Sequence, residues 1–204
     1  LKAASDLGIN FIDTAPAYGN SEERLGALLK KVPNDWVICS KVGEEYNEGK
    51  SYFNFTASHT RTSIERSLKR LGRESIDIVL VHSNGEDLNI IREEEVLDEL
   101  ARLKQRGLLL SYGMSTKTIE GGLLAAQHTD AVMVSYNMNY RDEKDVLDQC
   151  VLNHTGLLIK KGLASGHLMG SNGYNIQEAM NFIFSHPAVS SMVVGTINPN
   201  HLKN

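Results

Sequence analysis

The sequence predicts a (β/α)8 barrel that lacks its first strand, and three observations support this fold class. Short apolar runs rich in β-branched residues alternate with helical patterns along the chain, which favours a parallel sheet covered by helices. Seven such strands follow one another in βα units of roughly 25 to 40 residues, a series that suits a barrel better than an open sheet. No linker-like segment divides residues 1–204, so we expect a single domain.

The expected elements follow in a regular order. The strands cover 9–12, 36–40, 76–81, 108–113, 131–136, 156–160 and 190–194. The helices between them cover about 21–31, 58–71, 94–106, 117–127, 142–153 and 176–186. Ser21 and Ser58 fit helix starts, and Gly72 and Gly107 fit helix ends.

The first recognisable element, residues 1–7, resembles the end of a helix, and the first residue is not methionine. We therefore expect that the N-terminal strand and the C-terminal end of the barrel are truncated in this chain. A barrel that lacks one strand has two unpaired sheet edges, which makes it incomplete by itself.

Composition indicates an ordinary globular protein of the cytoplasm. Hydrophobic residues make up 41% and charged residues 23% of the chain, and the net charge is −4. A chain without an excess of basic residues lacks the positive charge that binding to nucleic acid or an anionic membrane requires. Its apolar runs are too short to span a bilayer. Cys39 and Cys150 are expected to be separate buried thiols. No metal site is predicted, and the expected partner is a small molecule.

Four ionisable residues fall at the ends of three successive expected strands. Asp13 ends the first strand and Tyr18 follows it across a short loop, whereas Lys41 and His82 end the next two strands. Alone, each has an ordinary explanation as a helix cap, a solvated side chain or a packing residue. Together they lie at the carboxyl end of a parallel barrel, where barrel enzymes place their active sites.

This set of side chains suits the reduction of a carbonyl group, which needs a hydride at carbon and a proton at oxygen. A tyrosine keeps its proton at neutral pH, since its ordinary pKa is ~10. Lys41 is expected to lower the pKa of Tyr18, and Asp13 to keep Lys41 charged. His82 can orient the carbonyl oxygen by a hydrogen bond.

The segment GINFIDTAPAYGNSEERLG resembles the active-site signature of the aldo-keto reductase superfamily. KVG at 41–43, LVH at 80–82 and the helix end SIERSLKRLG at 63–72 are also similar to the family pattern. The resemblance covers nearly the whole chain. It implies a (β/α)8 barrel that reduces an aldehyde or ketone with NADPH, NADH also being possible, without a Rossmann motif. It also implies a catalytic tetrad of Asp13, Tyr18, Lys41 and His82, with Tyr18 as proton donor.

The cofactor segments depart from the family pattern. Where the family has Ser-Asn for the nicotinamide carboxamide, this chain has Ser115 and Thr116. Where the family has a glutamine, this chain has Met133, and Asn137 is a possible substitute. Lys160 stands where many members have a tyrosine that stacks on the nicotinamide.

Two further segments are expected to hold phosphate groups. Lysines followed by a small-residue loop suit a diphosphate through charge and backbone N–H groups, and a solvated basic turn is the alternative. The residues are Lys160, Lys161, Gly162, Leu163, Ser165 and Gly166. The resemblance implies that the adenosine end of the cofactor is bound by Gly195, Thr196, Asn198 and His201. No arginine is available there to make bidentate hydrogen bonds to a 2′-phosphate.

The loop 44–56 is expected at the mouth of the barrel, with Tyr46, Tyr52 and Phe53 as an aromatic wall of the substrate pocket. Packing over the barrel mouth is the alternative. Two other functions stay open at this point. One is a catalytically weak barrel of the same family that binds cofactor and acts as a regulator. The other is a Schiff-base lyase that uses Lys161 or Lys41.

Overall fold

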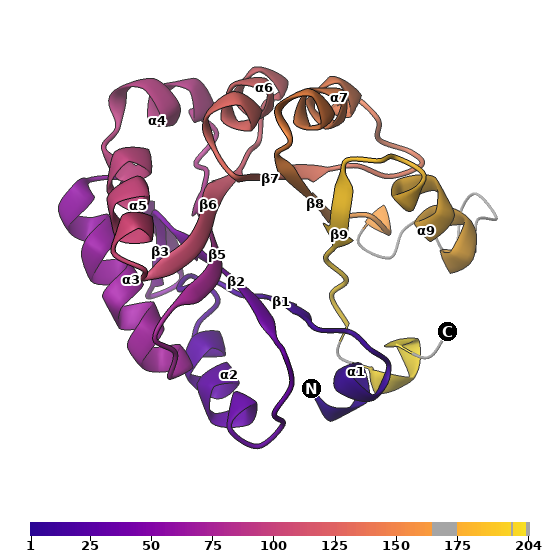
Figure 1. Ribbon diagram of the computed structural model, residues 1–204, viewed down its shortest axis with the longest axis horizontal. Coiled ribbons are helices and arrows are strands. Elements are labelled where there is room, and N and C mark those ends of the chain that lie inside the picture. The colour runs from indigo at the N-terminus through magenta and orange to yellow at the C-terminus, as the bar shows by residue number, and fades with distance from the viewer. Residues whose placement is uncertain (165–174, 197, 203–204) are drawn as a thin grey trace.

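The computed structural model describes residues 1–164, 175–196 and 198–202. Its main sheet has seven parallel strands in the order β1-β2-β5-β6-β7-β8-β9. They are β1 (Phe11–Asp13), β2 (Val37–Val42), β5 (Ile76–His82), β6 (Leu109–Ser115), β7 (Ala131–Ser135), β8 (Gly156–Lys160) and β9 (Val189–Met192). The sheet curves into a nearly closed barrel, and among the described residues no strand joins β1 to β9 (Figure 1). The predicted fold class is confirmed.

Helices surround the sheet on its outer side (Figure 1). They are α1 (Lys2–Asp6), α2 (Ser21–Leu29), α3 (Ala57–Leu71), α4 (Asp87–Glu93), α5 (Val96–Gln105), α6 (Ile119–His128), α7 (Lys144–Asn153), α9 (Ile176–Phe184) and the 3₁₀ helix η2 (Pro199–Leu202). Gly72 ends α3 with φ 65°, as predicted, but the side-chain cap at its start is Thr56 rather than Ser58. None of the helices in the described part of the chain is long and apolar enough to cross a membrane.

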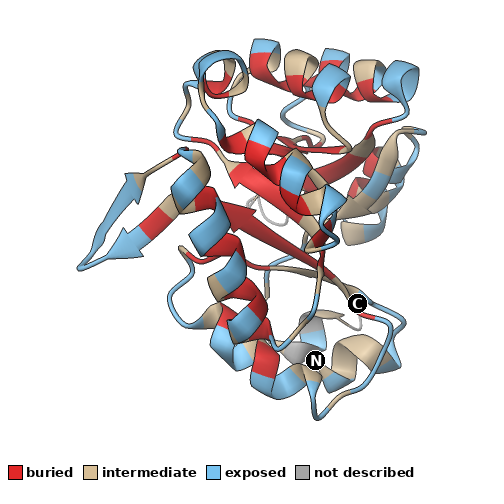
Figure 2. Ribbon diagram, turned by 60° about the vertical axis from the view of Figure 1, so that its left-hand side comes forward, coloured by how far each residue is buried: buried red, intermediate tan, exposed pale blue. Residues whose placement is uncertain are grey.

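The segment predicted as a loop after β2 is an antiparallel hairpin of β3 (Glu44–Asn47) and β4 (Lys50–Phe53). It projects from the body of the molecule (Figure 2). Gly43 makes the turn into it, with φ 100° and with the Phe55 ring 2.4 Å from where a Cβ would lie. Only glycine fits both constraints, and this turn fixes the position of Glu44.

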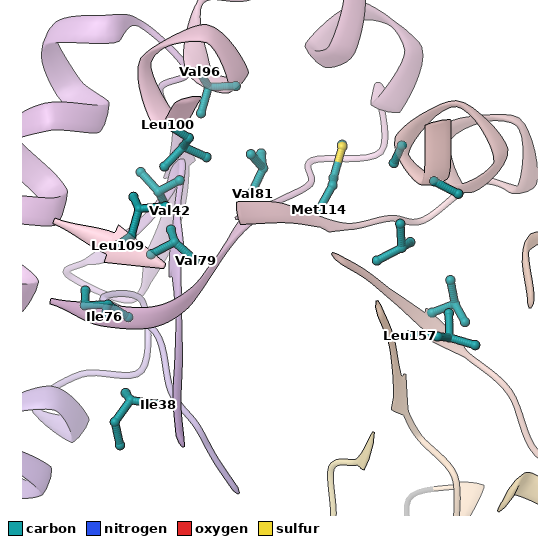
Figure 3. Packing of buried hydrophobic residues seen from close by; sticks show 14 of the residues in the cluster. Ile38, Val42, Ile76, Val79, Val81, Val96, Leu100, Leu109, Met114 and Leu157 are labelled. Carbon is teal, nitrogen blue, oxygen red and sulfur yellow. The ribbon is translucent and has the colours of Figure 1, made fainter. Parts of the chain in front are cut away.

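Strand residues alternate between two buried layers, as the period of a β-strand requires. Val79, Val81 and Leu157 point outward and pack against the helices. Figure 3 shows Leu100 and Val96 of α5 beside the outward side chains of the sheet. Both cysteines are buried free thiols, as predicted, Cys150 in this outer layer.

The inner layer of the barrel is small and apolar at its base. It consists of Cys39, Leu80, Ala131, Met133 and Leu158. On three of the strands the next inward position, two residues further along, is ionisable: Lys41 follows Cys39, His82 follows Leu80, and Lys160 follows Leu158. The alternation that builds the core therefore also aims ionisable side chains into the mouth of the barrel.

Gly26 permits the close approach of α2 to α3, which together support the β1 and β2 side of the barrel. A Cβ at this position would lie 2.1 Å from the carbonyl oxygen of Arg70. We expect Gly26→Ala to lower the free energy of unfolding by about 1–3 kcal/mol, because the helices must separate. Urea denaturation measures the change. Gly195→Ala is the matched control, because its Cβ would meet nothing within 4 Å, and its expected effect is within about 0.5 kcal/mol.

Candidate active site

A cavity of about 780 Å³ opens at the carboxyl ends of the strands. All four residues of the predicted tetrad line it, together with Ser115, Thr116, Asn137, Lys160 and Lys161. With Val193 after β9, all seven barrel strands or the loops that follow them contribute residues to this cavity. The size of this cavity and its position at the carboxyl ends of the strands suit a nucleotide cofactor together with a small substrate.

Lys41 is the most deeply buried charged residue of the cavity, with 2% of its side chain exposed. Its Nζ contacts Asp13 Oδ1 and donates a hydrogen bond to the Thr14 carbonyl oxygen at 3.1 Å. Burial acts to lower the pKa of Lys41, but Asp13 and the neighbouring Cys39 and Tyr18 raise it above its ordinary value. Lys41 is therefore a fixed cation at neutral pH.

Tyr18 extends over this ion pair from the loop between β1 and α2. Lys41 Nζ lies 5.8 Å from the centre of the tyrosine ring, and the His82 ring meets it edge-on at 6.1 Å. Burial raises the pKa of Tyr18, and the opposing effect of Lys41 does not cancel the rise. Lys41 acts in the predicted direction, but the net shift is upward, because desolvation of the phenolate outweighs the effect of the ammonium. Tyr18 accordingly keeps its proton through the neutral range.

His82 ends β5 and has a neighbour that the sequence did not suggest. Its Nδ1 lies 2.6 Å from Glu44 Oε2, an ion-pair distance, although the ring N–H is not aligned for a regular hydrogen bond. Burial lowers the pKa of His82, Glu44 raises it, and Lys41, Lys160 and Lys117 lower it further, with a net decrease. His82 is thus mainly neutral at pH 7.

Lys160 reaches from β8 across the mouth of the barrel to the end of β6. Its Nζ donates hydrogen bonds to Ser115 Oγ at 3.0 Å and to the Thr116 carbonyl oxygen at 2.7 Å. Burial lowers its pKa to about 8, with Glu143 opposing the decrease. The predicted residues Ser115, Thr116 and Lys160 thus form one cluster, and Lys160 faces inward rather than onto a basic surface turn.

The turn after β8 has an unusual backbone. Lys161 and Ala164 have positive φ values of 57° and 47°, which cost energy for residues other than glycine and are frequent at functional sites. Asn137 supports this turn, since its Nδ2 donates to the Lys161 carbonyl oxygen at 3.0 Å. Its Oδ1 accepts from the Asn139 N–H at 2.9 Å. Asn137 therefore holds the backbone of the turn as well as lining the cavity.

Other predicted residues lie away from the cavity. Gly162 is buried against Met192, and Leu163 lies in the same turn without lining the cavity. Ser165 and Gly166 lie outside the described residues. Gly195, Thr196 and Asn198 follow β9, where Thr196 Oγ1 accepts from the Asn198 N–H at 3.1 Å, and His201 lies in η2. Tyr46 and Tyr52 are 53% and 52% exposed on the hairpin, and Phe53 packs beside Phe55, so none of the three lines the cavity.

Besides Glu44, sequence reasoning missed two further acidic residues, one in the cavity and one beside it. Glu143 lines the cavity, and its Oε2 is buried without a hydrogen-bond partner. Burial raises its pKa, and Lys160 and the Ser135 backbone N–H oppose the rise. Asp87 is buried and accepts from the Lys117 and Thr118 N–H groups at 2.8 and 2.7 Å, which joins the loops after β5 and β6. An acidic residue at a helix start was the only sequence signal, and it is indistinguishable from an ordinary cap.

The fold and the cavity define a nearly closed parallel α/β barrel with aspartate, tyrosine, lysine and histidine grouped at its mouth. The description "Aldo/keto reductase family" belongs to a family model that matches residues 1–178. The chain belongs to the aldo/keto reductase family.

Individual relatives agree with this assignment. A crystal structure of an aldo-keto reductase from Pseudomonas aeruginosa superposes with a TM-score of 0.91 at 50% identity, covering 98% of this chain and 77% of that one. D-Arabinose 1-dehydrogenase of Saccharomyces cerevisiae is 31% identical over 71% of this chain and 46% of its own length. NADH-specific methylglyoxal reductase of Escherichia coli is 29% identical over 82% of this chain and 56% of its own. The chain spans about half the length of these two curated relatives.

Proposed function

We propose that this protein is a nicotinamide-dependent oxidoreductase that interconverts an aldehyde or ketone and the corresponding alcohol. The observation that carries the proposal is the convergence of Asp13, Tyr18, Lys41 and His82 in one cavity. Membership of the aldo/keto reductase family supports it, as does the nature of the relatives, among them a sugar dehydrogenase and a methylglyoxal reductase.

The walls of the cavity fit a nicotinamide nucleotide. The unpartnered Oε2 of Glu143 can accept the N–H groups of a carboxamide, and the cluster of Lys160 and Ser115 lies in the same cavity. Lys161 adds positive charge at the rim of the cavity, where it can attract the diphosphate of the nucleotide. The bound nicotinamide would supply the hydride in reduction and accept it in oxidation.

Each tetrad residue has one task in this proposal. Tyr18 donates its proton to the carbonyl oxygen in reduction and receives it back in oxidation. Lys41 stabilises the phenolate that remains after proton transfer, and Asp13 holds Lys41 in position. His82 contacts the oxygen from the other side and orients it. Proton transfer by a positioned group of this kind contributes about 10²–10⁴ in rate.

NADPH is the proposed cofactor and NADH the alternative. The loop after β9 is the proposed binding site of the adenosine end of the cofactor. Calorimetric titration with each nucleotide tests both the cofactor class and the preference. Saturable binding with turnover of methylglyoxal or another aldehyde supports the proposal. Binding without turnover across aldehydes and ketones favours the regulatory barrel, and no binding by the folded protein refutes both. The fluorescence of Trp36 would be a poor reporter of nucleotide binding, because Trp36 precedes β2 and so lies at the opposite end of the barrel from the cavity.

Nucleotide affinity should depend on pH through Lys160. Because the pKa of Lys160 is lowered to about 8, its positive charge is present below that pH and is lost above it. The nucleotide is anionic, so we expect the affinity for NADPH to fall about tenfold as pH rises through 8, in keeping with the loss of one charged contact. Calorimetry between pH 6.5 and pH 9.5, roughly the window that brackets this titration, measures the effect.

Lys160→Met should remove this pH step and leave a uniformly weaker affinity. Lys161→Met is the matched control, since it takes a charge from the same cavity but leaves Lys160 in place. It should weaken binding and preserve the step. A step that persists in Lys160→Met would assign the titration to another group.

A further inference from the structure

The cavity at the mouth of the barrel carries more positive than negative charge, although the whole chain has a net charge of −4. In the described part of the chain it is lined by four lysines and two carboxylates, which are Lys41, Lys117, Lys160, Lys161, Asp13 and Glu143. Lys41 pairs with Asp13, and Glu143 and Lys160 each oppose the pKa shift of the other. Lys117 and Lys161 remain in excess, so the cavity favours anionic ligands.

Lys117 lies on a different side of the cavity from the two lysines proposed for the nucleotide. Lys160 ends β8 and Lys161 follows it, whereas Lys117 follows β6. His82 on β5 is the register partner of Ser115 on β6, and Lys117 is two residues beyond Ser115 along the chain. The charge of Lys117 acts on His82 and lowers the pKa of the ring. One small substrate can therefore lie within reach of both residues.

The carboxylates closest to Lys117 are engaged elsewhere. Glu44 Oε2 lies 2.6 Å from His82 Nδ1, and Asp87 Oδ2 accepts from the backbone N–H of Lys117 at 2.8 Å. Among the described residues, Lys117 Nζ makes no ion pair, and it lies 5.9 Å from the centre of the Phe53 ring of the hairpin. The backbone of Lys117 is thus held in place, and its ammonium is available at the rim of the cavity.

We propose that Lys117 is a specificity-determining residue that selects carbonyl substrates with an anionic group, either a carboxylate or a phosphate. This inference rests on the proposed function and names the substrate class of that site. While Tyr18 and His82 hold the carbonyl oxygen, the Lys117 ammonium can make a charge-assisted hydrogen bond to an anionic group elsewhere on the same substrate. The contact adds binding energy for anionic substrates and takes no part in hydride or proton transfer.

The position of Lys117 at the rim limits the strength of this contact. Lys117 is exposed, and water and salt weaken a charge pair at an exposed site. We therefore expect a preference of about five- to tenfold in kcat/KM, in keeping with one hydrogen bond of modest net strength. A larger preference would require a buried partner.

Two matched pairs of aldehydes test the inference on protein saturated with the nucleotide that binds better. Succinic semialdehyde carries a carboxylate where butanal has a methyl group, and glyceraldehyde 3-phosphate carries a phosphate that glyceraldehyde lacks. Wild type should show the higher kcat/KM with the anionic member of at least one pair, and that pair identifies the anion. The preference should shrink as the ionic strength rises from about 0.01 M to about 0.5 M, because salt screens the contact.

Lys117→Met should bring the ratio of kcat/KM within the preferred pair close to unity, and Lys117→Arg should restore the preference. Lys50→Met is the matched control, since Lys50 is an exposed lysine of the hairpin that does not line the cavity. It should keep the wild-type ratio. Equal kcat/KM within both pairs in wild type, or a preference that persists in Lys117→Met, would overturn the inference.

A binding measurement separates this inference from the proposed function. Calorimetry on protein mixed with NADP⁺ needs no hydride transfer and compares the affinities within each pair of aldehydes. Tighter binding of an anionic aldehyde, lost in Lys117→Met, by a protein that reduces none of the four would contradict the proposed function and support the role of Lys117. Reduction of the uncharged aldehydes without any advantage for the anionic ones would contradict the role of Lys117 alone.

Discussion

Replacing Tyr18 with phenylalanine should lower the turnover number about 10²–10⁴-fold, the contribution typical of a positioned proton donor. The ring lies 5.8 Å from Lys41 Nζ and meets His82 edge-on, so its hydroxyl is the group that the tetrad can supply as an acid. Phenylalanine keeps the ring and its packing and removes the hydroxyl group that would donate the proton. Steady-state reduction of methylglyoxal and calorimetric titration with NADPH measure the two effects.

Nucleotide affinity should change little in Tyr18→Phe, because the hydroxyl serves the chemical step rather than cofactor binding. Tyr46→Phe is the matched control, since Tyr46 is half-exposed on the hairpin and does not line the cavity. It should retain turnover. Wild-type rates in Tyr18→Phe would mean that another group donates the proton.

Asp13→Asn should destabilise the fold by about 3 kcal/mol and lower turnover by at least about 10²-fold. Lys41 is 2% exposed, and among the described residues its Nζ has only the Thr14 carbonyl oxygen as a hydrogen-bond partner apart from Asp13. Removing the carboxylate leaves a buried ammonium without its counter-charge, which costs more than the pair itself contributes. Urea denaturation and steady-state kinetics measure the two losses.

The double variant Asp13→Asn with Lys41→Met separates stability from catalysis. Methionine has a similar length and no charge, so the double variant should recover at least half of the stability lost in Asp13→Asn. It should stay inactive, because nothing then stabilises the Tyr18 phenolate. Recovered turnover would contradict the role of Lys41. A double variant less stable than Asp13→Asn would contradict the account of a buried, unpaired cation.

The sequence predicted the barrel and the tetrad because both depend on short-range patterns. The apolar run of β5 identifies it as a strand in the sequence. Its last residue, His82, lies at the mouth of the barrel because the carboxyl ends of all parallel strands meet there. The β3–β4 hairpin was missed because its strands are short and polar and carry charged residues such as Glu44 and Lys50. Polar strands lack the alternation that identifies a half-buried strand.

The rest of the site depends on how strands are staggered and how deeply side chains are buried. Lys160 contacts the end of β6, 45 residues away in sequence, only because β6, β7 and β8 are neighbours in the sheet. Glu44 contacts His82 only through the turn at Gly43. The net direction of the Tyr18 pKa shift depends on desolvation, and residue spacing does not reveal desolvation.

The most direct test of the central claim is a single-turnover experiment on the intact chain. Protein saturated with NADPH, and in parallel with NADH, is mixed with excess methylglyoxal, and nicotinamide absorbance is followed with time. We predict an exponential loss of the reduced cofactor in wild type and a rate at least about 10²-fold slower in Tyr18→Phe. No oxidation of a cofactor that is demonstrably bound, with this and other aldehydes, would contradict the assignment of the cavity as a carbonyl-reducing site.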